Sequence, residues 1–97
     1  MKISNVLGSI VYDKVNSKRL ATNGNQQITL FSIETGKELP PHASTMDAMI
    51  VVLEGALEIH IDSQDQVLNT HDLLTFGRNQ EHKIRAITNC SFLLIQS

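Results

Sequence analysis

The chain has 97 residues, a hydrophobic fraction of 41% and a formal net charge of -2. Its length fits a single domain, and its hydrophobic fraction is that of a folded globular protein rather than a disordered one. The scattered basic residues provide no surface for nucleic acid or an anionic membrane, and no apolar run approaches the roughly 20 residues of a membrane-spanning helix.

The N-terminal segment, residues 1–20, has a broken apolar stretch and no cleavage signal, so we predict no export. Apolar residues recur at helical spacing within residues 3–11, but Gly8 and several β-branched residues weaken a helix there. We expect this segment to pack on the rest of the domain or on a partner subunit. Cys90 is the only cysteine. It excludes an internal disulfide and predicts a reducing, cytoplasmic location.

Turn-forming residues recur at short intervals from residue 23 onward. They lie at residues 23–25, 35–37, 54–55, 62–63, 69–72, 77–80 and 88–89. The runs between them are short and rich in Ile, Val, Leu, Phe and Thr. Short strands at such spacing predict an all-β sandwich or barrel.

Residues 46–53 form a predicted strand with two apolar faces. Ala48, Ile50 and Val52 alternate with Met49, Val51 and Leu53. A strand of this kind is covered on both sides. The barrel interior covers one side, and either the N-terminal segment or a second copy covers the other. Since a chain this short gains burial by pairing, we expect a homodimer through the second face.

Two later runs alternate cleanly between apolar and polar residues. In LEIHID, residues 57–62, the isoleucines share a buried face, and His60 lies on the solvated face. In HKIRAI, residues 82–87, His82 shares the buried face with Ile84 and Ala86.

The stretch from Gly36 to Ala86 resembles the two-motif core of the RmlC-like cupin superfamily. Motif 1, about residues 36–55, has a glycine, then His42 after five residues, and it ends in the sequence VLEG. Motif 2, about residues 71–86, has an acidic residue and His82 at the usual separation. The resemblance implies one cupin-type double-stranded β-helix, a jelly-roll barrel, over residues 1–97. It is strongest to small bacterial cupins of unassigned role.

The resemblance also implies a metal site of three histidines and one glutamate. Here only His42 and His82 remain, because Ser44 and Ala48 occupy the other two positions. Neutral imidazoles alone hold a divalent ion weakly. We therefore predict no strong metal site, with a weak divalent transition-metal site at His42 and His82 as the alternative.

We predict that His42, Ser44 and His82 are the polar groups of a barrel pocket that binds a small organic molecule. An imidazole titrates near neutrality and binds carboxylates, phenols or enols. The alternatives are a metal-dependent enzyme of isomerase or dioxygenase type with an incomplete two-histidine site, and a structural dimer with a vestigial pocket. Whether a reaction is catalysed stays open, because one barrel hosts many chemistries.

Three other residues are weaker candidates. We expect His60 to be solvated surface and His71 to be a turn residue. Cys90 is expected to be a small buried hydrophobe, since no basic neighbour is evident to activate it.

Overall fold

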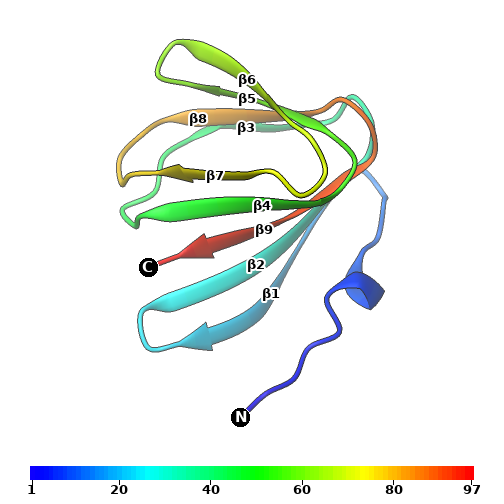
Figure 1. Cartoon of the computed structure of the whole chain (residues 1–97), viewed down its shortest axis with the longest axis vertical. Helices are drawn as coiled ribbons and strands as arrows, with labels where there is room; N and C mark the ends of the chain where they lie inside the picture. The colour runs from blue at the N-terminus through cyan, green and yellow to red at the C-terminus, as the bar shows by residue number, and fades with distance from the viewer.

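The computed structural model describes residues 1–97, which fold into two antiparallel sheets packed face to face (Figure 1). The nine strands are β1 Val15–Asn23, β2 Gln26–Ile33, β3 Glu38–His42, β4 Ala48–Glu54, β5 Leu57–Ile61, β6 Gln64–Leu68, β7 Leu73–Phe76, β8 His82–Ala86 and β9 Cys90–Gln96. One sheet has the order β1-β2-β9-β4-β7 and the other β3-β8-β5-β6. This confirms the predicted all-β jelly roll.

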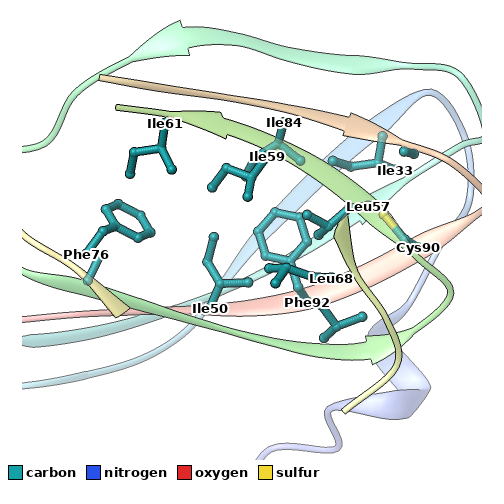
Figure 2. Close-up of a cluster of buried hydrophobic side chains, with 13 residues drawn as sticks. Ile33, Ile50, Leu57, Ile59, Ile61, Leu68, Phe76, Ile84, Cys90 and Phe92 are labelled. Atoms are coloured by element: carbon teal, nitrogen blue, oxygen red, sulfur yellow. The ribbon is translucent and has the colours of Figure 1, made fainter. Parts of the chain in front are cut away.

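The core lies between the inward faces of the two sheets. It contains Ile33, Ala48, Ile50, Val52, Leu57, Ile59, Ile61, Leu68, Phe76, Ile84, Ala86, Cys90 and Phe92. Figure 2 shows Phe76 and Ile61 at one end of this cluster and Cys90 toward the other. The predicted inward faces of residues 46–53, 57–62 and 82–87 are all confirmed. Phe92 also stacks on Phe31, with ring centroids 5.1 Å apart.

The outward face of the four-stranded sheet is charged. Its ion pairs are Lys83 with Glu38 at 3.3 Å, Arg85 with Glu58 at 3.5 Å, and His60 with Asp65 at 2.6 Å. Exposed pairs of this kind contribute only about 0–1 kcal/mol each to stability. This face is the solvated one that the alternation predicted.

Residues 1–14 form an arm outside the sheets, and the remainder of the predicted N-terminal segment belongs to β1. The arm runs beside β1 in Figure 1. Its only helical element is the single 3-10 turn η1, Leu7–Ser9, so the helical spacing of residues 3–11 does not produce a helix. No helix in the structure has both the length and the apolar character to cross a membrane.

Gly55, in the turn between β4 and β5, has a φ of 76°. A Cβ atom at this position would collide with the backbone carbonyl oxygen of Asn89. Two constraints therefore require glycine at the end of the VLEG sequence: the left-handed backbone and the close approach of another loop.

We predict that Gly55→Ala destabilises the fold far more than Gly24→Ala. Gly24 has a similar φ of 60°, but no atom lies within 4 Å of the point that a Cβ atom would occupy there. Gly24→Ala, the control, should therefore lose only the free energy of placing an alanine in the left-handed backbone region, about 1–2 kcal/mol. Urea unfolding of both variants measures the difference. Equal destabilisation would contradict the collision with Asn89.

Candidate functional site

His42 and His82 lie side by side at one end of the barrel. His42 ends β3, His82 begins β8, and the two residues are direct partners in the strand register. Their ring centroids are 4.2 Å apart, and the ring planes are tilted by 60°. His42 is exposed, whereas His82 is only 4% exposed. The structure therefore brings these two predicted site residues together.

Phe76 also packs against His82. Its ring centroid is 4.6 Å from that of His82, and Phe76 belongs to the core cluster. The three rings form a series that leads from the core through His82 to His42 at the surface. Two rings therefore pack against His82, which is buried.

Backbone carbonyl groups hold both imidazoles. Nδ1 of His42 lies 3.0 Å from the carbonyl oxygen of Pro40, and Nδ1 of His82 lies 3.0 Å from that of Gln80. A carbonyl oxygen only accepts hydrogen bonds, so Nδ1 carries the proton in both rings. When a ring is neutral, its Nε2 atom is then an acceptor available to a ligand.

The protonation of His82 depends on its burial. Burial lowers the pKa of His82 below its usual value, and the nearby charge of His42 lowers this pKa further. The hydrogen bond to Gln80 acts in the opposite direction. Since burial is the largest of these effects, His82 is a neutral imidazole at pH 7.

Ser44 makes its hydrogen bonds elsewhere. Its Oγ atom accepts from the backbone N–H of Met46 at 3.0 Å and from the side-chain amide of Gln96 at 3.1 Å. No hydrogen bond joins Ser44 to either histidine. Its hydroxyl group joins the loop before β4 to the end of β9, and the role of Ser44 in ligand binding stays a prediction.

Gln96 is the residue that the sequence reasoning missed. It lies directly opposite Ala48 across the β4–β9 pair, and Phe76 lies opposite Ala48 on the other side. Residues alternate along β9, so Gln96 shares the inward face with Phe92. The sequence pattern could have indicated Gln96, because it is a polar residue at an inward position at the end of an otherwise apolar strand.

The donor atoms at this end of the barrel do not fit the four-ligand metal site of the resemblance. No group of three or more His, Cys, Asp or Glu side chains lies close enough to hold a metal ion. Ala48 offers only a methyl group. The neighbouring Asp47 carboxylate accepts from the backbone N–H of Arg78 at 3.1 Å and pairs with its guanidinium at 3.3 Å.

The cavities of the structure are spread over its surface, and only a small one reaches the histidine pair. The largest, about 540 Å³, has Ala48, Phe76 and Gln80 in its wall. A small one of about 70 Å³ borders His82. None of the larger cavities is lined by His42 or Ser44. A ligand that reaches both rings therefore approaches from the exposed side of His42.

The weaker candidates occupy the places that the sequence predicted. His60 is exposed and paired with Asp65, and His71 is an exposed turn residue with a φ of 73°. Cys90 is fully buried. Burial raises the pKa of its thiol to about 11, which keeps it protonated and unreactive at neutral pH.

Comparisons with known proteins are consistent with this architecture. A protein-family model described as a cupin domain matches residues 29–96. The chain is similar to an RmlC-like cupin protein from Desulfovibrio desulfuricans, with 26% identity and a TM-score of 0.89 over 100% of this chain and 96% of that one. It is also similar to a cupin superfamily protein from Desulfitobacterium hafniense, with 25% identity and a TM-score of 0.85 over 99% of this chain and 91% of that one. A third similar structure is a conserved protein of unknown function from Streptococcus pyogenes, with 25% identity and a TM-score of 0.86 over 98% of this chain and 85% of that one. No curated protein matches.

Metal content tests the donor set directly. We predict less than about half an equivalent of any transition metal in protein purified without added metal, because two imidazoles define a site poorly. Elemental analysis of the unmodified protein, His42→Ala and the surface control His60→Ala makes the measurement. Stoichiometric metal that is lost only in His42→Ala would contradict this prediction.

The lowered pKa of His82 predicts a specific pH dependence of stability. Below about pH 6.5 the unfolded chain binds a proton at His82 more readily than the folded chain does. The free energy of unfolding should therefore fall as the pH is lowered from about 6.5 through the folded-state pKa. This loss should be smaller in His82→Gln, and His71→Asn should retain it. Urea unfolding at about pH 7.5 and pH 5 measures the effect, and equal losses in all three proteins would refute it.

Proposed function

Because the chain belongs to the cupin domain family, we propose that it binds a small organic molecule at His42 and His82. The two imidazoles are the observation that carries this proposal. Both rings are fixed through Nδ1, and each leaves Nε2 free. Two free acceptor atoms on adjacent, oriented rings form a recognition element for a small polar group.

The chemistry of the rings defines the ligand class. A neutral His82 accepts a hydrogen bond from a hydroxyl group, as in a sugar, a phenol or an enol. His42, at the surface, provides a second contact and the entrance. Phe76, below His82, supplies an apolar ring to the neighbouring 540 Å³ cavity, which is within the usual size range for a metabolite site. We place the ligand at this end of the barrel.

The donor set does not favour a metal-dependent isomerase or dioxygenase. The usual glutamate is the one anionic ligand of such a site, and Ala48 stands in its place. A divalent ion would then meet neutral protein ligands only. We also infer a cytoplasmic location, supported by the single, buried and unpaired Cys90.

A thermal-shift screen of small acids, sugars and phenols tests the proposal. A ligand at about 100 times its Kd stabilises the folded state by about 2.7 kcal/mol, which raises the Tm of a domain of this size by roughly 10 °C or more. We expect at least one compound to act on the unmodified protein and on His60→Ala, and to lose its effect on His42→Ala.

Two outcomes would overturn the proposal. If no compound raises the Tm, the site is vestigial and the protein is not a binder of this ligand class. If His42→Ala responds as strongly as the unmodified protein, the ligand binds away from the two histidines.

A further inference from the structure

The loop between β7 and β8, residues 77–81, carries the chain from one sheet to the other. β7 belongs to the five-stranded sheet and β8 to the four-stranded sheet. Figure 1 shows this loop at the same end of the barrel as the β3–β4 and β5–β6 connections. His82 follows the loop directly, so the conformation of the loop determines how the imidazole enters the site.

Gln80 joins this loop to both sheets through its side-chain amide. Its Oε1 atom accepts from the backbone N–H of Gly77, directly after β7, at 2.7 Å. Its Nε2 atom donates to the carboxylate of Asp62, directly after β5, at 2.6 Å. A backbone N–H only donates and an ionised carboxylate only accepts. These two partners therefore determine the orientation of the amide.

The backbone carbonyl group of the same residue accepts from Nδ1 of His82 at 3.0 Å. Gln80 thus bonds to the imidazole through its main chain while its side chain is held between Gly77 and Asp62. A residue restrained in this way cannot easily turn its carbonyl oxygen away from the ring. Gln80 is half-buried and lies in the wall of the 540 Å³ cavity.

His42 has the same kind of bond but a different restraint. Its Nδ1 atom lies against the carbonyl oxygen of Pro40, and Pro41 follows. A proline ring fixes its own φ and restricts the residue before it, so the backbone itself holds that carbonyl group. The loop before His82 contains no proline. The direction of the Gln80 carbonyl group therefore depends on the side-chain bonds of Gln80.

We propose that Gln80 is the positioning residue of the site: its amide, held between Gly77 and Asp62, determines which ring nitrogen of His82 faces a ligand. While the carbonyl group accepts from Nδ1, the free nitrogen is Nε2, an acceptor. Without this restraint the proton of the neutral ring distributes over both nitrogens, and part of the molecules present a donor instead. The effect on ligand binding rests on the proposed function, whereas the effect on the tautomer does not.

Nitrogen-15 NMR of the histidine rings tests the proposal, because the shifts of the two ring nitrogens report the fraction of each tautomer. Spectra are recorded at about pH 8, where imidazoles are neutral, and His82→Gln assigns the signals of His82. Gln80→Met removes both side-chain bonds at similar side-chain length. We expect it to shift the tautomer ratio of His82 toward Nε2–H by at least about 3-fold, as for a weakened hydrogen bond. His42 should be unchanged and is the internal control.

Asp62 supplies an independent pair of variants. Its φ is 53°, which glycine and asparagine both tolerate. Asp62→Gly removes the acceptor of the Gln80 amide and should shift the ratio in the same direction, even if Gln80→Met fails to fold. Asp62→Asn keeps an acceptor oxygen and should leave the ratio unchanged. Gln66→Met, at an exposed glutamine of β6, is the matched control for the change from glutamine to methionine.

Two outcomes would overturn the proposal. An unchanged ratio for His82 in folded Gln80→Met and Asp62→Gly would mean that the ring is held without Gln80. Equal shifts for His42 and His82 would mean that the substitutions disturb the whole end of the barrel. Circular dichroism confirms that each variant is folded.

The readout needs no ligand, so it is separate from the thermal-shift screen. A failed screen would refute ligand binding at the histidines and leave the tautomer result as it stands. For a compound that the screen identifies, we expect a Kd at least about 3-fold higher with Gln80→Met than with Gln66→Met. Equal Kd values would overturn the role of Gln80 in recognition.

Discussion

The period-two alternation along β5 and β8 determines which side chains the barrel encloses. Ile59 lies opposite Ile84, and Ile61 lies opposite His82, so the histidine occupies an inward position because the isoleucines do. A slip of β8 by one residue would turn His82 to solvent together with the core residues Ile84 and Ala86. Burial of the isoleucines thus positions the histidine, and the geometry of the site follows from the packing of the core.

The site lies where the apolar core ends. Phe76 lies at the end of the core, its ring packs against that of His82, and the ring of His82 packs against that of His42. Burial disfavours the charged form of His82, while the Gln80 carbonyl group fixes its tautomer. The same location therefore provides a neutral imidazole with a defined free acceptor. The exposed His71 lacks both the burial and the carbonyl contact, although its side chain is chemically identical.

Sequence reasoning found the strands, their inward faces and the histidine pair, because these depend on local alternation and on motif spacing. It did not find that Ser44 bonds to Gln96 or that Phe76 contacts His82. Ser44 and Gln96 are distant in the chain, while Phe76 and His82 are close in the chain but lie on strands of different sheets. No local pattern encodes either contact. The path of the arm was also missed, since it is held mainly by individual hydrogen bonds rather than by a repeating apolar face.

Those hydrogen bonds show what the arm does for the five-stranded sheet. The register of β1 is irregular between Arg19 and Ala21, and the carbonyl group of Leu20, between them, accepts from Lys2.

At the other end of the arm, the Tyr12 hydroxyl donates to the Glu54 carboxylate at 2.7 Å and lies 3.3 Å from the Ser91 hydroxyl. Partial burial in this contact raises the pKa of Tyr12. The arm therefore satisfies polar groups at the irregular and terminal parts of the sheet, where water would otherwise be required. The regular centre of β4 and β9 has its backbone groups paired within the sheet, and this leaves it free to present an uninterrupted apolar surface.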